Sequence, residues 1–149
     1  VRKVLDVENA DLRRPVTELG GRSLGETLLT PTRIYVKSVL AALKKARVRS
    51  IAHITGGGFY ENIPRCLPRG MQAVISKKSL PRPAVFDLIG KKGGIPEKEM
   101  YATFNMGVGM CLAVAAEDAD KALAALRSEG EEAFVMGEVR PGEEGVVMC

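Results

Sequence analysis

Apolar side chains recur at helical spacing over residues 32–46, directly after a helix-start signal. Four of them fall at positions i, i+3, i+4 and i+7: Val36, Val39, Leu40 and Leu43. This spacing predicts one buried stripe along a helix. Thr30 and Pro31 mark the start of that helix, because threonine can cap it and proline at the first helical position has no amide that needs a partner.

Two further segments have the pattern of helices. Residues 117–130 begin with acidic side chains and end at Gly130, a typical stop signal. Their apolar stripe consists of Ala119, Ala122, Leu123 and Leu126. Residues 83–94 predict another helix, closed by two glycines.

Strict alternation over residues 48–55 predicts a strand. Successive side chains of a strand point to opposite faces, so His53 and Thr55 share a face and Ala52 and Ile54 lie on the other. The three glycines at 56–58 follow, and residues 59–67 predict a short helix, in which Pro64 must lie near the first turn or kink the helix.

The rest of the chain predicts three further strand regions. Residues 71–76 form a short apolar run, and 97–116 form a longer one that is interrupted at Gly107 and Gly109. Glycines there indicate a bulge or a close backbone neighbour. Residues 132–149 predict a terminal hairpin-like pair of strands around a Pro-Gly turn.

Taken in order, these elements alternate between helix and strand. Such alternation predicts a sheet covered by helices, with some antiparallel pairing at its end. The first residues fit this scheme less well, because residues 1–27 begin as a short apolar-periodic piece and become polar and rich in Gly and Pro. We interpret them as the tail of a preceding element and a linker, and residues 28–149 as the domain. On this interpretation the chain, which begins at Val1, is part of a longer protein; a cleaved initiator Met is the alternative.

Composition is that of one globular domain: 149 residues, 46% hydrophobic and 27% charged. No apolar run approaches the ~20 residues that span a bilayer, which excludes a membrane protein of that kind. The three cysteines form no CxxC pair, and there is one histidine, so a structural zinc site is not expected. A reducing compartment, the cytoplasm, is the expected location.

Charge is unevenly distributed along the chain. Residues 1–100 hold 19 Lys and Arg against 9 Asp and Glu, whereas residues 101–149 hold 3 against 9. A basic majority suits phosphorylated ligands or an acidic partner, although scattered solvated lysines give the same count. The few aromatic residues do not interleave with the basic ones, so nucleic-acid binding is not expected.

The sharpest chemical feature is the strand that ends in three glycines and opens into a helix. Free backbone amides there, with the helix dipole, favour a phosphate or another oxyanion, but a purely structural turn explains the glycines equally well. The segment has neither the Walker A nor the GxGxxG spacing. His53 is either an acid or base near neutral pH or a residue that holds the loop. Asn62 is expected to bond the loop backbone, and Arg65 to contact phosphate or carboxylate.

Three blocks resemble a known family: LLTPTRIYVKSVL at 28–40, AHITGGGFYENIPRCLP at 52–68 and MYATFNMGVGM at 100–110. They are similar to signature blocks of aminoimidazole ribonucleotide synthetase, also called phosphoribosylformylglycinamidine cyclo-ligase, and the resemblance extends over essentially the whole chain. It implies that the chain is the C-terminal domain of a two-domain enzyme. The implied fold is α+β, a mixed sheet with packed helices.

The resemblance also implies a reaction, the ATP-dependent cyclisation of formylglycinamidine ribonucleotide to aminoimidazole ribonucleotide in purine biosynthesis. ATP phosphorylates the formyl amide oxygen, and a nitrogen of the substrate then closes the ring and releases phosphate. The N-terminal domain is implied to bind most of the ATP and Mg²⁺ and to form a homodimer. The isolated domain is then expected to be inactive. The alternatives are a non-catalytic binding or assembly module, and a sister ATP-using family such as selenophosphate synthetase.

The family's functional positions match nine residues of this chain. His53 is implied to transfer a proton or to position the loop. Contacts to ATP or to the substrate phosphate are implied for Thr55, Gly56, Gly57, Gly58, Asn62 and Arg65, and in the first block for Thr32 and Arg33. No metal ligand is assigned to this chain.

Overall fold

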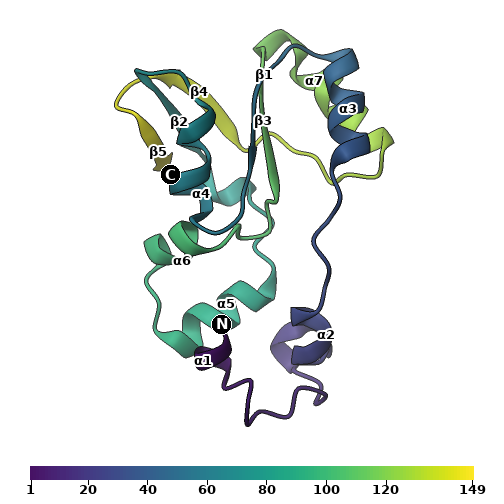
Figure 1. The fold of residues 1–149 in the computed structure, drawn as a ribbon, viewed down its shortest axis with the longest axis vertical. Coiled ribbons are helices and arrows are strands. Elements are labelled where there is room, and N and C mark those ends of the chain that lie inside the picture. Colours follow the sequence, from purple (N-terminus) through teal and green to yellow (C-terminus); the bar gives the residue numbers. More distant parts are fainter.

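The computed structural model describes all 149 residues, as an elongated molecule (Figure 1). Its helices are α1 (Arg2–Leu5), α2 (Leu24–Leu28), α3 (Val36–Lys45), α4 (Gly58–Asn62), α5 (Ala84–Gly93), α6 (Glu97–Thr103) and α7 (Ala119–Ser128). Its strands are β1 (Val48–His53), β2 (Met71–Ile75), β3 (Met110–Val114), β4 (Gly137–Pro141) and β5 (Gly145–Met148). No helix is long and apolar enough to cross a membrane.

The strands form two small sheets. β1 pairs antiparallel with β3, so that His53 lies opposite Met110. In the second sheet β2 lies in the centre, antiparallel to β4 and parallel to β5. The fold is therefore α+β with a mixed sheet, as the resemblance implied, although the strands are divided between two sheets.

The prediction that residues 132–149 form a terminal hairpin-like pair of strands is wrong. β4 and β5 do not pair with each other, because β2 lies between them. β2 carries the buried side chains Ala73 and Ile75 and takes hydrogen bonds on both of its edges. The connection between β4 and β5 crosses the end of β2, where the Gly142 amide donates to the Gly70 carbonyl at 3.0 Å.

The prediction of a strand over residues 97–116 is wrong in its first part. Residues 97–103 form α6, which bears Glu97 and Glu99 in its first turn, where acidic side chains are favoured, and buries Met100 and Tyr101. The strand β3 begins only at Met110. The apolar run thus contains a helix, a glycine-containing loop and a strand.

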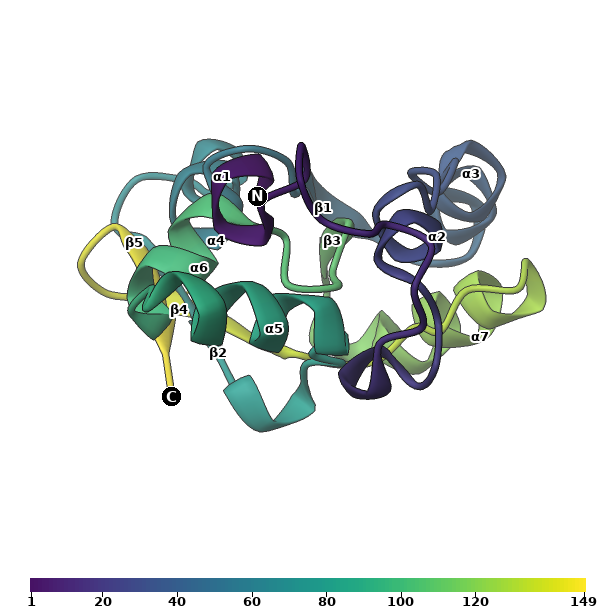
Figure 2. The same cartoon turned by 90° about the horizontal axis from the view of Figure 1, so that it is seen from below.

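The helix over 32–46 is confirmed, but its start and its buried face are not those predicted. α3 begins at Val36, with Tyr35 at its N-cap, rather than after Thr30 and Pro31. Its buried residues are Ser38 and Ala42, which face α7; the two helices lie side by side at one end of the molecule (Figures 1 and 2).

Most of the predicted apolar stripe of α3 is exposed. Val36, Leu40 and Leu43 are 61%, 52% and 47% exposed, whereas Val39 is half-buried. In this chain α3 packs against α7 through its small residues Ser38 and Ala42, and Ser38 Oγ also donates to Glu131 Oε1, just beyond the end of α7, at 2.9 Å. The stripe is left without a partner in this chain.

The remaining predicted elements are confirmed. β1 and β2 lie where the pattern placed them. The helix over 59–67 is confirmed in its first part: α4 ends at Asn62, and a 3-10 turn, Pro64–Cys66, follows. α5 ends at Gly93, and its C-cap Gly94 has a φ of 59°, the left-handed conformation expected of a glycine cap. α7 buries Ala122, half-buries the other three residues of its predicted stripe and ends two residues before Gly130.

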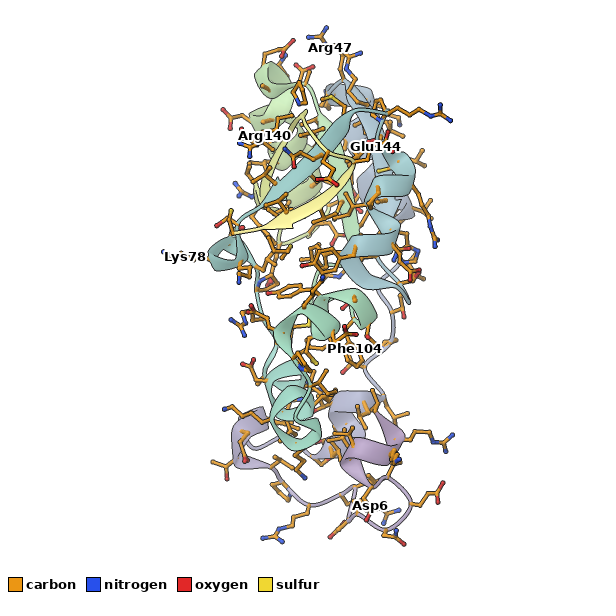
Figure 3. The ribbon with its side chains drawn as sticks, turned by 90° about the vertical axis from the view of Figure 1, so that its left-hand side faces the viewer. Asp6, Arg47, Lys78, Phe104, Arg140 and Glu144 are labelled. Atoms are coloured by element: carbon orange, nitrogen blue, oxygen red, sulfur yellow. The ribbon has the colours of Figure 1, made fainter.

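Residues 1–27 pack on α5 at the end of the molecule away from α3 and α7 (Figure 1). Leu5, Leu19 and Leu24 are buried in the same cluster as Leu88 and Ile89 of α5. Side chains from this segment mark one end of the molecule at Asp6, and Arg47 marks the other (Figure 3). Whether the segment acts as a linker stays a prediction.

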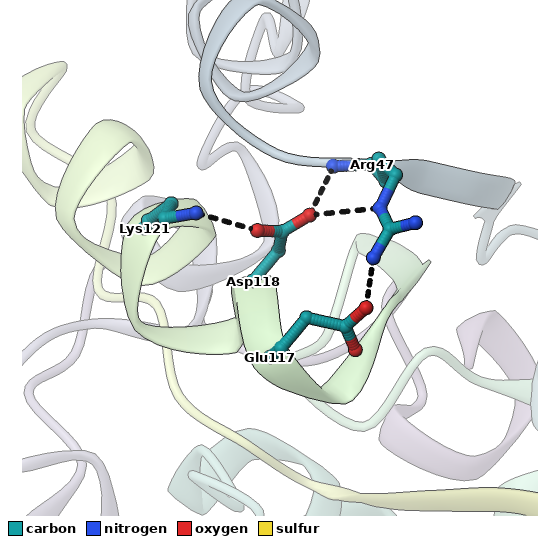
Figure 4. Close-up of polar contacts among 4 residues, drawn as sticks. All are labelled: Arg47, Glu117, Asp118 and Lys121. Carbon is teal, nitrogen blue, oxygen red and sulfur yellow. Dashed lines mark hydrogen bonds and ion pairs between the residues drawn. The ribbon is translucent and has the colours of Figure 1, made fainter.

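An ion-pair network ties the start of β1 to the start of α7 (Figure 4). The Asp118 carboxylate is 9% exposed and accepts from Lys121 Nζ at 2.8 Å and from the Arg47 backbone amide at 3.0 Å. Arg47 also pairs with Glu117. These hydrogen bonds, that of Lys121 first, lower the pKa of Asp118 from its ordinary 3.8 to about 2.

We expect Asp118→Asn to weaken the fold at neutral pH and to flatten its acid dependence. The stabilisation by the Asp118 carboxylate is fully present above its unfolded pKa and is lost as the pH falls through about 2. Urea unfolding between pH 2 and 6 measures the effect, with Asp120→Asn as control, because Asp120 is exposed and forms no ion pair. Parallel pH profiles for the wild type and Asp118→Asn would contradict this prediction.

Candidate functional site

The strand β1 delivers His53 to the surface beside the glycines. Ala52 and Ile54 are 5% and 1% exposed, whereas His53 and Thr55 are exposed, as the alternation predicts. The Ile54 amide donates to the Gly109 carbonyl at 2.8 Å and so extends the pairing with the β3 side by one step. The His53 imidazole forms no hydrogen bond or ion pair within the chain, which leaves both of its nitrogens available to a ligand.

The glycine run forms a tight turn with free amides. Gly57 and Gly58 have φ of 92° and 54°, in the left-handed region that favours glycine. The Gly58 amide donates to the Thr55 carbonyl at 3.0 Å. In contrast, the amides of Thr55, Gly56 and Gly57 donate to no acceptor in the chain. Three successive unpaired donors at the surface are a suitable set for an oxyanion.

Gly58 has a second reason to be glycine. A Cβ there would lie 2.0 Å from the carbonyl oxygen of Tyr101 in α6, so the two backbones are in direct contact. The next residue, Phe59, is fully buried, with its ring edge-to-face against Tyr101 at a centroid distance of 5.5 Å. Gly56 differs, because a Cβ there would meet nothing within 4 Å. The loop is thus anchored at Gly58 and open at Gly56.

Asn62 holds the loop from below. Asn62 is 8% exposed, and its side-chain Nδ2 donates to the carbonyl oxygens of Gly58 at 2.8 Å and Gly56 at 3.2 Å. This is the backbone contact that the residue type suggested. In this arrangement the amide of Asn62 is committed to the loop, and the free donors of the loop are its backbone amides.

We expect Asn62→Ala to destabilise the protein by about 2 kcal/mol, because it removes two hydrogen bonds and leaves the buried Gly58 carbonyl without its side-chain donor. Denaturant unfolding measures the change. The control is Asn9→Ala, since Asn9 bonds only to Asp6 in an exposed pair; its effect should stay within about 0.5 kcal/mol. Equal unfolding midpoints for the two variants would show that Asn62 does not brace the loop.

The two arginines of the predicted set form no contact with His53 and pair with carboxylates instead. Arg65 is exposed and pairs with Glu61 at 3.3 Å, while Arg33 pairs with Glu131 at 2.9 Å. Both line a cleft of about 1240 Å³ between the two sheets, whose lining does not include His53 or residues 55–58. Thr32 is exposed and forms no hydrogen bond. The structure therefore brings His53, the glycine loop and Asn62 together, with Arg65 on the following turn, and leaves residues 32 and 33 outside this group.

Two uncharged residues that contact the site, Tyr35 and Tyr101, were not predicted from the sequence. Tyr101 supplies the carbonyl that backs Gly58. Tyr35 lies against His53, with ring centroids 6.1 Å apart. Both residues were inside the blocks that carried the family resemblance, which was the available signal.

Other reactive groups do not add to the site. Burial, and to a smaller extent the nearby Cys66, raises the pKa of the Cys111 thiol to about 12, so it is not a nucleophile at neutral pH. No group of three or more His, Cys, Asp or Glu side chains is placed to hold a metal ion.

Comparison with known proteins matches the whole chain to one family. Residues 1–149 match the family described as "AIR synthase related protein, C-terminal domain". A phosphoribosylformylglycinamidine cyclo-ligase from Caldicellulosiruptor bescii is 50% identical over 149 residues. The match covers 99% of this chain and 44% of that relative, so the chain spans less than half of the relative's length.

Proposed function

Because the chain belongs to the AIR synthase related family, whose C-terminal domain it matches over its full length, we propose that it is the C-terminal domain of a phosphoribosylformylglycinamidine cyclo-ligase. The proposed reaction is the ATP-dependent closure of formylglycinamidine ribonucleotide to aminoimidazole ribonucleotide in purine biosynthesis, in the cytoplasm. The 50% identity to the cyclo-ligase of C. bescii supports this choice over the sister families that share the fold.

One observation of the structure carries the proposal: the exposed His53 lies next to three free backbone amides, at Thr55, Gly56 and Gly57. A cyclisation driven by phosphoryl transfer needs donors for phosphate oxygens and a group that moves a proton. The loop supplies the first and the imidazole the second. Asn62, not His53, braces the loop, which favours proton transfer over loop positioning as the task of His53.

The reaction then proceeds in two steps. The formyl amide oxygen of the substrate attacks the γ-phosphorus of ATP, and ADP leaves. A nitrogen of the amidine next attacks the activated carbon, the ring closes, and phosphate departs with the former amide oxygen. The loop amides would bind a phosphate group of ATP or of the substrate during both steps. His53 would accept the proton that the attacking nitrogen loses. Arg65 would add a charged donor once its exposed pair with Glu61 opens.

The residues of this chain fit a phosphate but not the metal ion that accompanies ATP. The free amides and Arg65 are anion donors, whereas no acidic cluster offers ligands for Mg²⁺. We therefore assign the metal and most of the ATP contacts to the part of the polypeptide that the relative has beyond this domain.

That further part is also the proposed partner of this chain. The exposed apolar side chains of α3, Val36, Leu40 and Leu43, have no partner here, and their burial against the other domain would be favourable. The homodimer that the family resemblance implies is then proposed to form through the same additional domain.

A chimaera tests the proposal directly. The 149 residues would replace the matching segment of the C. bescii cyclo-ligase, and the formation of aminoimidazole ribonucleotide would be measured with ATP and Mg²⁺. We expect turnover by the chimaera and none by the chain alone. Selenide and thiamine monophosphate serve as substrates for the sister activities. A folded chimaera that leaves formylglycinamidine ribonucleotide unchanged would refute the proposed function.

A further inference from the structure

The aromatic ring of Tyr35 contacts the His53 imidazole. The two ring centroids are 6.1 Å apart and the ring planes are inclined by 70°, an edge-to-face arrangement. Tyr35 comes from the segment before α3, and His53 from the end of β1, 18 residues later in the chain. Edge-to-face pairs of this kind are attractive and have a preferred geometry.

Gly109 is shaped to receive the Tyr35 ring. A Cβ at position 109 would lie 2.0 Å from Tyr35 Oη and 2.8 Å from Cζ, so any other residue would displace the ring. The backbone of Gly109 is not in the left-handed region, and its conformation therefore does not require glycine. The contact with Tyr35 is what requires it.

The same glycine is tied to the strand that carries His53. The Gly109 carbonyl accepts from the Ile54 amide at 2.8 Å, and its neighbour Met110 is the register partner of His53. The Tyr35 ring thus rests on the backbone that fixes the end of β1. Its position is defined relative to His53 and not only to α3.

Glu131 fixes the chain segment that carries Tyr35. Its carboxylate is 15% exposed and accepts from Arg33 at 2.9 Å and from Ser38 at 2.9 Å. Arg33 precedes Tyr35 in the chain and Ser38 follows it. Ser38 Oγ also lies 3.0 Å from the Tyr35 carbonyl oxygen, to which it can donate. The segment that presents the ring is therefore clamped before and after it.

We propose that Tyr35 is a positioning residue for His53. The imidazole is exposed and forms no hydrogen bond or ion pair in the chain, so without the ring its side chain would rotate among several rotamers. The contact with Tyr35 selects one orientation of the imidazole before substrate binds. This raises the rate of catalysis, because a correctly oriented group reacts faster than a mobile one. This inference rests on the proposed function for its consequence on catalysis, but not for the contact itself.

The single histidine makes the contact measurable. His53 gives the chain's one set of imidazole signals, and NMR would record their chemical shifts and their magnetisation transfer to the Tyr35 ring. Three variants separate the parts of the contact: Tyr35→Phe keeps the ring, Tyr35→Leu removes it, and Gly109→Ala displaces it while Tyr35 stays. Phe134→Leu is the control, because it removes a partly exposed aromatic ring from a segment outside the helices and strands.

We expect Tyr35→Phe and Phe134→Leu to leave the His53 signals unchanged. Tyr35→Leu and Gly109→Ala should shift these signals and, in the chimaera, lower kcat by about ten- to a hundredfold. The KM for ATP should not change. Unshifted His53 signals in both of these variants, or an unchanged kcat of the active chimaera in both, would overturn the proposal. Shifted signals in a chimaera that has no activity even with Tyr35 would instead leave the contact established and refute the proposed function.

Discussion

Gly58→Ala is expected to cost about 3 kcal/mol or more of folding stability and to abolish activity. Two separate penalties act at this position. Alanine at φ 54° is strained by about 1–3 kcal/mol. Its Cβ would also lie 2.0 Å from the Tyr101 carbonyl oxygen, and that overpacking costs about 1–3 kcal/mol more. The backbone of α6 cannot move away without disturbing the buried Tyr101.

Two other glycines separate these penalties. Gly20 has φ 67° with nothing within 4 Å of its Cβ position, so Gly20→Ala carries the strain alone. Gly56 has neither a positive φ nor a close neighbour, so Gly56→Ala should be neutral within about 0.5 kcal/mol. Denaturant unfolding of the three variants should rank Gly58→Ala as the least stable, then Gly20→Ala, then Gly56→Ala. Equal losses for Gly58→Ala and Gly20→Ala would show that the contact with α6 is not tight.

The glycine loop was predictable because its determinants are local. Alternation ends at Thr55, three glycines follow, and a helix begins, and all of this lies within one short segment. The exposure of His53 and the burial of Ala52 follow from the same alternation. The sequence did not distinguish a structural turn from a ligand loop. The structure shows the structural role, because Gly58 packs against α6, and the ligand role of the open Gly56 stays a prediction.

Predictions failed where a distant segment decides. The buried face of α3 is the one that packs on the distant helix α7, where Ser38 also bonds Glu131, 93 residues away. Helical periodicity favoured the leucine face, because an isolated stripe is expected to be buried. Similarly, two strands joined by a Pro-Gly turn are typical of a hairpin. They flank β2 instead, because both of its edges are open to pairing.

The positions of the arginines could not be read from their spacing. Arg65 lies three residues after Asn62, and the sequence places both near the glycines, but Arg65 turns toward Glu61 and the cleft between the sheets. Arg33 pairs with Glu131. In the sequence, Arg33 lies before Tyr35 and the glycines of the loop lie after it. An ion pair exposed on both sides, like that of Arg65 and Glu61, contributes little to stability, so the fold should tolerate a substitution of Arg65.

The second large effect concerns His53. We expect His53→Ala to lower the turnover of the chimaera by about 100-fold or more, the usual range for a lost general acid or base. The melting temperature should fall by a few degrees at most, because the exposed side chain forms no hydrogen bond or ion pair and loses only its ring contact with Tyr35. Arg49→Ala is the control: Arg49 lies on the same strand, four residues earlier, is exposed and forms no hydrogen bond or ion pair with another side chain.

The most direct test is therefore the rate of aminoimidazole ribonucleotide formation by the chimaera and by its His53→Ala and Arg49→Ala variants, measured at a temperature at which all three proteins are folded. We expect turnover near that of the parent chimaera for Arg49→Ala and a loss of about 100-fold or more for His53→Ala. Equal rates for all three proteins would contradict the claim that the exposed end of β1 and its glycine loop form a wall of the active site.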